Sequence, residues 1–172
     1  MKKLNFLFII SIAAMFFVSC GYHLSGTGSF LPKHIKKISV PMFKNKTTRY
    51  QLDQKLTQAV INELIARGRF EVLSGEQKAD ALLLGEIISF KVNPISFTEQ
   101  TRADRYSITI VAKVTFKDLI RKKVIFTNPN FIFRDEYELQ GGTDFFSEET
   151  EAIERISEKF ARSVVSTILE GF

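Results

Sequence analysis

The region after residue 34 of this 172-residue sequence predicts an α+β fold, a two-layer sandwich with two helices on one face of a roughly four-stranded mixed sheet. Apolar and polar residues alternate over Tyr106–Phe116, which is the period of a half-buried strand. Apolar residues recur at steps of three and four around 52–64 and 153–169, which is the period of amphipathic helices. The predicted order is strand, helix, three strands, a further strand segment and a final helix.

The first two elements are a short strand and a helix. Ile38 and Val40 alternate with polar neighbours and are followed by Pro41, which removes a backbone N–H at the strand end. The helix is expected to begin near Thr47 or Thr48 and to close at Gly68. Its apolar stripe consists of Leu52, Leu56, Val60, Ile61 and Leu64. This strand-helix-strand passage is long enough for a right-handed parallel crossover.

Two strands follow, Phe70–Leu73 and Ala81–Val92. The second is expected to end before Pro94, with a polar loop over Thr98–Asp104. Its predicted inward face consists of Leu82, Leu84, Ile88, Phe90 and Val92.

The strand Tyr106–Phe116 has six apolar residues on one side and mostly Thr, Ser and Lys on the other. The polar side therefore meets water or a polar partner. After a turn at Asp118–Lys123, the segment Val124–Leu139 changes its apolar parity on either side of Asn128-Pro129-Asn130. Either a bulge within one strand or a turn between two strands would keep both sets inward. Gly141 and Gly142 end this segment.

The last helix has the clearest pattern in the chain, with Ser147 as its expected N-cap. Its apolar stripe consists of Ile153, Ile156, Phe160, Val164, Ile168 and Leu169. Phe145 and Phe146 are placed in a turn before it, where they either form a docking surface or pack against the helix start.

The N-terminus has the layout of a secretory signal peptide over residues 1–19. Lys2 and Lys3 supply its positive charge, and the apolar run Leu4–Val18 is shorter than the roughly 20 residues of a transmembrane helix. The single cysteine, Cys20, follows this run directly, which resembles the bacterial lipobox and predicts lipidation at Cys20. A permanent membrane span and a buried free thiol are the weaker alternatives.

Residues 20–34 are predicted to form a lipidated start and a Gly/Ser-rich tether, and residues 35–172 a single domain. A lone cysteine makes no internal disulfide, so the exported domain must be stabilised by packing. Without Lys2 and Lys3 the basic residues exceed the acidic ones by three, a mildly basic balance that suits an anionic partner such as a phosphorylated lipid. The export signal argues against nucleic acid.

The sequence offers few residues from which a catalytic or metal-binding site could be built. The only histidines, His23 and His34, lie in or beside the tether and are interpreted as solvated or rim residues. We therefore expect no enzyme, no metal and no cofactor, although paired catalytic carboxylates remain an alternative. The remaining candidate is a binding surface. Arg102 and Arg105 flank the loop before the long strand, and a second basic set lies after that strand, at Arg121, Lys122 and Lys123. Arginine suits phosphate capture, although charge in turns more often serves solubility.

Short motifs along the chain resemble the LptE family of lipopolysaccharide-assembly lipoproteins. They are Cys20-Gly21-Tyr22-His23-Leu24, Leu31-Pro32, Ile38-Ser39-Val40-Pro41, Ala79-Asp80-Ala81, Leu84-Gly85 and Tyr106. The resemblance implies an outer-membrane lipoprotein that sits in the lumen of the LptD barrel and helps to insert lipopolysaccharide into the outer leaflet, its domain facing the periplasm or the lumen. It also implies lipopolysaccharide contact through basic residues near the end of the sheet, for which Arg102 and Arg105 are nominated by location. The alternatives are an adaptor of another envelope machine and a lipid-anchored hydrolase.

Overall fold

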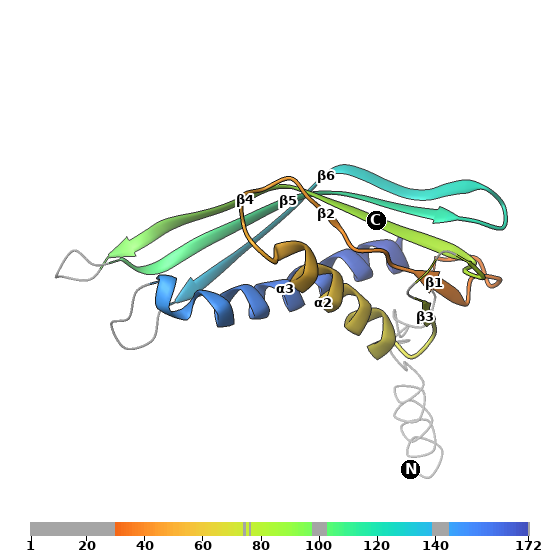
Figure 1. Ribbon diagram of the computed structural model, residues 1–172, viewed down its shortest axis with the longest axis horizontal. Helices are drawn as coiled ribbons and strands as arrows, with labels where there is room; N and C mark the ends of the chain where they lie inside the picture. Colours follow the sequence, from red (N-terminus) through yellow and green to blue (C-terminus); the bar gives the residue numbers. More distant parts are fainter. Residues whose placement is uncertain (1–29, 74, 76, 98–102, 139–144, 172) are drawn as a thin grey trace, which may run out of the picture.

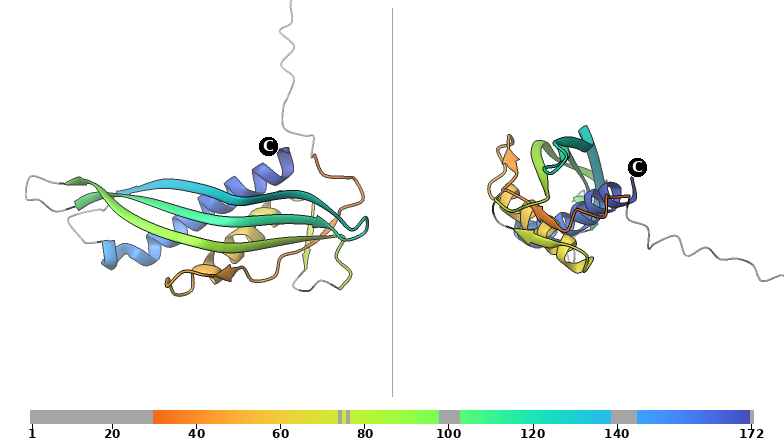
Figure 2. Two further views of the ribbon diagram at one scale, coloured as in Figure 1. Left: turned by 90° about the horizontal axis from the view of Figure 1, so that it is seen from above. Right: turned by 90° about the vertical axis from the view of Figure 1, so that its right-hand side faces the viewer.

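The computed structural model describes residues 30–73, 75, 77–97, 103–138 and 145–171, with the side chains of all but Asp104 and 145–149. Figure 1 shows a long curved sheet with two helices below it, and Figure 2 shows α3 crossing behind the long strands. The elements in chain order are β1 (Lys37–Ser39), β2 (Lys44–Asn45), α2 (Leu52–Ala66), β3 (Glu71–Leu73), β4 (Ala81–Phe97), β5 (Ala103–Asp118), β6 (Lys123–Glu138) and α3 (Phe145–Glu170). The predicted α+β class, with two helices on one sheet face, is confirmed.

The sheet is mixed, and its strand order over the described residues is β3-β1-β4-β5-β6, with β2 also paired to β4. β1 lies parallel to both β3 and β4, and β2 is parallel to β4. β4, β5 and β6 form an antiparallel meander. This sheet has six strands where roughly four were expected. The difference includes β2, a two-residue strand too short to show a sequence period.

Helix α2 begins at Leu52, later than the expected Thr47 or Thr48. The reason is a local turn in which the Asn45 side chain accepts the backbone N–H of Thr47 at 2.9 Å and donates to the Arg49 carbonyl at 2.7 Å. Gln51 then adopts a left-handed φ of 56° before the helix starts. At the other end the helix stops at Ala66, and Gly68 takes a positive φ of 66°, close to the predicted end.

The inward face of β4 differs from the prediction. Ala81, Leu83 and Ile87 are the buried residues that join the core cluster, whereas Ile88 is 40% exposed. A register shift between Ile87 and Ser89 changes the parity, so that Phe90 and Val92 point inward after it. The expected inward positions of Leu84 and Ile88 are therefore wrong, and Leu82 is buried outside the main cluster.

β4 also continues through Pro94 to Phe97, and β5 already begins at Ala103. The expected end of the strand before Pro94 is wrong, and Asp104 belongs to β5 instead of a loop. Pro94 faces Tyr106 of β5. Beyond Ile87, β4 has no recorded partner strand on its other side in the described part of the chain, so the N–H that proline lacks needs no partner there.

Asn128-Pro129-Asn130 is an irregularity within one strand, β6, and not a turn between two strands. The register moves from Ala112 opposite Phe131 to Val114 opposite Asn128, which leaves an extra residue in β6. A second shift lies between Phe126 and Val124. Because two shifts occur, Phe126 packs against the core as expected, while Val124 is 44% exposed and its predicted inward position is wrong.

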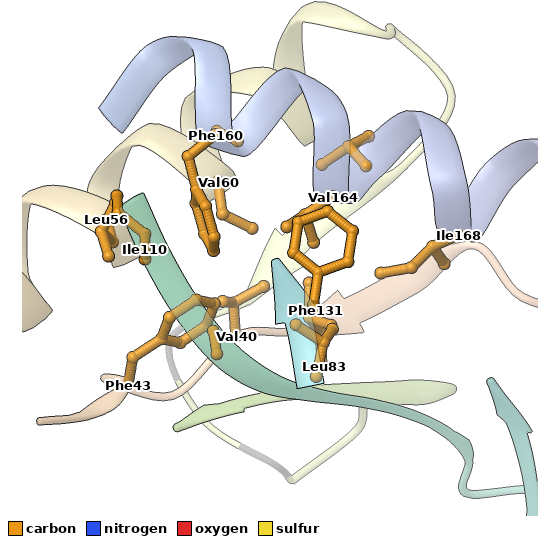
Figure 3. Close-up of a cluster of buried hydrophobic side chains, with 14 of the residues drawn as sticks. Val40, Phe43, Leu56, Val60, Leu83, Ile110, Phe131, Phe160, Val164 and Ile168 are labelled. Atoms are coloured by element: carbon orange, nitrogen blue, oxygen red, sulfur yellow. The ribbon is translucent and has the colours of Figure 1, made fainter. Parts of the chain in front are cut away.

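Helix α3 begins at Phe145, so Phe145 and Phe146 form its first residues and Ser147 lies inside the helix, not at its N-cap. The predicted apolar stripe of α3 is buried in full. Phe160 is fully buried and meets the rings of Phe131 and Phe133 edge-on, with centroids 5.8 and 5.9 Å apart. Figure 3 shows this core, in which side chains of α2 and α3 face those of β4, β5 and β6.

The segment between β1 and α2 is anchored by Phe43, which is 2% exposed. Its backbone N–H is accepted by the Thr57 hydroxyl of α2 at 2.9 Å. Its ring lies directly against Gly85 of β4, where a Cβ would overlap the Phe43 ring carbons. A glycine at position 85 is therefore required for Phe43 to reach the core.

Replacing Gly85 by alanine should destabilise the protein by about 1–3 kcal/mol, since the new methyl group overfills this contact. Urea unfolding measures the change, with Gly75→Ala as the control because no heavy atom lies within 4 Å of a Cβ there. Adding Phe43→Leu to Gly85→Ala should recover part of the loss. A Gly85→Ala protein as stable as the Gly75→Ala control would contradict this packing.

Candidate functional site

The lipidation candidate Cys20 and the loop residue Arg102 lie outside the described residues. The first described residues already belong to the domain. Leu31 is 6% exposed and part of the core, and the Phe30 N–H donates to the Leu169 carbonyl of α3 at 2.8 Å. Leu31 and the backbone of Phe30 therefore contact the domain from within the range that was predicted as the end of the tether.

His34 has a partner that the sequence does not reveal. Its Nε2 lies 2.8 Å from Oδ2 of Asp118, with the His34 side chain 26% exposed and that of Asp118 2% exposed. His34 is therefore a rim residue, as expected. Burial alone would raise the pKa of Asp118, but the backbone N–H of Arg121 and the His34 imidazole outweigh it and hold that pKa below its usual value.

Asp80 forms hydrogen bonds that connect the start of β1 to β4 and to the residue after β5. Its carboxylate accepts the backbone N–H groups of Lys36 and Lys37 at 2.9 and 2.8 Å. Its own N–H donates to the Lys37 carbonyl, and its carbonyl accepts from Leu119, at 2.8 and 2.9 Å. The two N–H donors from Lys36 and Lys37 lower the pKa of Asp80 below its usual value. Asp80 thus links the strand that enters the sheet to β4 and to the end of β5.

Asp80→Asn should cost about 1 kcal/mol at neutral pH, because charge-assisted bonds are lost at a half-buried, partly screened site. A lowered pKa in the folded protein stabilises it above the unfolded value of about 3.9, and this gain is lost as pH falls through the folded pKa. The stability gap between wild type and Asp80→Asn should therefore close below about pH 4. Thermal unfolding from pH 3 to 7 measures it.

The matched control is Glu71→Gln, which removes an exposed carboxylate 3.3 Å from Lys37 and should change stability by less than about 0.5 kcal/mol. A gap for Asp80→Asn that is constant over the whole pH range would remove the charge of Asp80 from the explanation.

The two predicted basic sets lie at opposite ends of the sheet. Arg105 is at the start of β5, with its guanidinium 4.0 Å from Glu136 of β6. Arg121 and Lys122 lie in the turn after β5, and Lys123 is the first residue of β6. All three are exposed, and Lys122 has a positive φ of 54°. Asp118 lies thirteen positions along β5 from Arg105, or about 43 Å. Arg105 and the hairpin set therefore cannot bind one small head group together.

A different cluster forms an open groove of about 470 Å³ on the helix-free face of the sheet. Residues on the outward face of β4 and β5 form most of its floor, and the segment from Pro41 to Lys44 forms one wall. The groove is lined by Pro41, Met42, Lys44, Leu84, Gly85, Glu86, Lys113, Thr115 and Lys117.

The groove carries excess positive charge. Its one acidic residue, Glu86, bonds Lys46 at 2.6 Å, and this bond, with help from Lys113 and Lys44, lowers the pKa of Glu86. Register explains the proximity, since Glu86 faces Lys44 of β2 on one side and Lys113 of β5 on the other. Among the ion pairs recorded for the described residues, none involves Lys44, Lys113 or Lys117.

The sequence shows only part of this groove. The alternation of Lys113, Thr115 and Lys117 indicates a polar outward face of the long strand. Lys44 gives no such signal, because it lies in a two-residue strand that pairs with β4 about forty residues later. The groove was therefore not predicted.

Two further findings concern the described residues alone. They contain no group of three or more His, Cys, Asp or Glu side chains arranged to hold a metal ion. No helix among them combines the length and apolar character needed to cross a membrane.

Solved structures with the same fold share little sequence with this chain. XCC0632 from Xanthomonas campestris has a TM-score of 0.57 at 12% identity, covering 80% of this chain and 86% of that one. The PelC dodecamer from Paraburkholderia phytofirmans has a TM-score of 0.55 at 12% identity, with 83% and 94% covered. Hypothetical protein CT253 from Chlamydia trachomatis has a TM-score of 0.55 at 11% identity, with 78% and 95% covered. At these identities the likeness concerns the fold alone.

No curated protein matches the sequence. The family comparison is more informative, because the model of LptE, described as lipopolysaccharide-assembly, matches residues 35–168. That range includes every helix and strand described above, apart from the last two residues of α3. The motifs at Ile38–Pro41, Ala79–Ala81 and Leu84-Gly85 thus lie within the match, and the chain belongs to the LptE family of lipopolysaccharide-assembly proteins.

Proposed function

We propose that this protein is an outer-membrane lipoprotein, anchored through acylated Cys20, that assembles with an LptD-type barrel and assists the insertion of lipopolysaccharide into the outer leaflet. The observation that carries the proposal is the LptE family match over residues 35–168. The leader over residues 1–19 supports export, and the lipobox-like end at Cys20 supports the anchor. Several buried acyl methylenes, at about 0.8 kcal/mol each, make such an anchor durable.

The shape of the domain supports a position in a polar barrel lumen. The helices cover one face of the sheet (Figure 1). The other face presents Ser107, Thr109, Lys113, Thr115 and Lys117, which alternate with the buried residues of β5. The interior of a large outer-membrane barrel is polar, so these polar positions of the face can meet it. The protein would act there by contact and not by turnover.

The direct test is extraction of native outer membrane with mild detergent and purification through a C-terminal tag on this chain. We expect a one-to-one complex with a large β-barrel protein, seen by size-exclusion chromatography with light scattering and identified by mass spectrometry. Recovery of free lipoprotein alone would count against the proposal. Recovery with a soluble or inner-membrane partner would instead favour an adaptor of another envelope machine, and an activity lost on changing one buried carboxylate would favour a hydrolase.

We also propose that Arg102 and Arg105 contact lipopolysaccharide, and that Arg121, Lys122 and Lys123 contact lipopolysaccharide or the barrel. Changing Arg102 and Arg105 together to Glu should weaken lipopolysaccharide binding, and the loss should shrink as salt screens the charges. Binding to the purified protein at several ionic strengths measures this. The control changes Lys33 and Lys36, exposed residues outside both basic sets, to Glu. Unchanged binding of the arginine variant at low salt would remove the pair from the site.

A further inference from the structure

We propose that the groove lined by Lys44, Lys113 and Lys117 is a second anionic-lipid site, which takes a phosphate group while the attached apolar chain lies along the neighbouring aliphatic surface. The inference rests on the proposed function for the class of ligand, a phosphorylated amphipathic lipid. It places that ligand on the helix-free face of the sheet, nearer to the hairpin set at Arg121–Lys123 than to Arg105.

The first support is charge. Lys44 reaches the groove from β2, whereas Lys113 and Lys117 reach it from β5, so the ammonium groups come from two sides. Glu86 is compensated by Lys46 at 2.6 Å and does not cancel the three lysines. A phosphate group carries up to two negative charges and three acceptor oxygens, which matches several lysines better than one carboxylate does.

The second support is the apolar surface beside the groove. Val111 pairs with Ile132 of β6 and with Ser89 of β4, directly after the bulged residue Ile88. Ile88 and Ile132 are 40% and 57% exposed, so the three side chains form an aliphatic stripe across three strands of the outer face. Val111 lies two residues from Lys113 on the same face, about 7 Å along the strand. An apolar chain attached to a phosphate bound at Lys113 therefore needs to extend only this short distance to contact the stripe.

The third support is a basic row on the far side of the stripe. Thr109 of β5 pairs with Lys91 of β4 and with Arg134 of β6, both exposed. The aliphatic stripe is therefore bordered by cations on both sides. A lipid with phosphates at both ends of its head group fits this arrangement, because each phosphate finds positive charge while the acyl chains cover Ile88, Val111 and Ile132.

An acidic peptide segment is the competing occupant, and the groove favours the lipid. A volume of about 470 Å³ is the size of a small-molecule site. A peptide would gain most by adding a strand to an open edge. At Glu86 and Ile87, beside the groove, that edge of β4 is paired with β2, and among the described residues the stretch of this edge without a partner strand begins beyond Ile87, outside the lining of the groove. The wall at Met42, which is 59% exposed, adds further apolar surface suited to a chain.

The experiment uses the full lipidated chain in detergent and three probes: a bisphosphorylated glucosamine lipid, the same lipid without phosphates, and inorganic phosphate. Lys113→Gln with Lys117→Gln should lower affinity for the phosphorylated lipid about tenfold or more at low salt, equivalent to about 1.4 kcal/mol. Affinity for the dephosphorylated lipid should be unchanged. Inorganic phosphate should compete only weakly, since it lacks the apolar chain.

Two matched variants make the result specific. Lys33→Gln with Lys36→Gln removes the same charge elsewhere and should change affinity less than about twofold, because only screened long-range attraction is lost. Lys113→Arg with Lys117→Arg should retain most of the binding, because the charge is kept. Thermal unfolding of each variant checks that the fold is intact.

An unchanged affinity in the Lys113/Lys117 glutamine variant would overturn the inference, as would an equal loss in the Lys33/Lys36 control. Loss of the barrel complex with lipid affinity retained would instead assign the groove to an acidic segment of the partner. Equal displacement of the lipid by low concentrations of inorganic phosphate would assign it to the free anion. These outcomes are distinct from failure of the proposed function, in which the wild-type chain itself forms no complex with a barrel protein.

Discussion

The structure depends on the packing of two helices against a single face of one sheet. Residues of α2 and α3 meet those of β4 and β5 in one continuous cluster, which includes the fully buried Leu56, Phe160 and Ile110. A sheet covered on one side buries its apolar residues there and leaves the other face to water or to a partner. The surfaces considered for function follow from this constraint, since every groove lysine lies on the uncovered side or at its edge.

Long strands can remain over such a core only if their parity is corrected along the way. The shift at Ile87/Ser89 turns Phe90 and Val92 inward, and the same shift leaves Ile88 on the outer face. The irregularity near Pro129 does the same for Phe131 in β6. The bulge in β4 thus has two effects, because it continues the core and also places the aliphatic side chain of Ile88 on the exposed surface.

The entry of the chain into the domain is a polar junction joined to the apolar core. Asp80 accepts two N–H groups from the β1 side, and His34 bonds Asp118 at the end of β5. Next to it, Leu31 enters the core and the Phe30 N–H reaches α3. A pull on the chain at Phe30 would therefore be resisted by the sheet and by α3 together.

Regular, strongly periodic segments were predictable from the sequence alone. Tyr106–Phe116 and the stripe of α3 have clear periods over many residues, so the type of each element and its buried side follow directly. The lipobox-like run before Cys20 is likewise a pattern of neighbouring residues. The later start of α2, the partner of His34 and the bulges at Ile87 and Pro129 left no such pattern. They depend on hydrogen bonds and packing between neighbours that a period does not encode.

The sequence by itself determined the class of the fold and the order of its main elements, because these depend on local composition and spacing; lipidation at Cys20 stays a prediction from the same local pattern. Only the tertiary structure decided which charges share a surface. It separated Arg105 from Arg121 by the length of β5, and it brought Lys44 to Lys113 through the register of β2 and β5 on β4. Strand register is set by contacts between residues far apart in the chain, and the local sequence does not specify them.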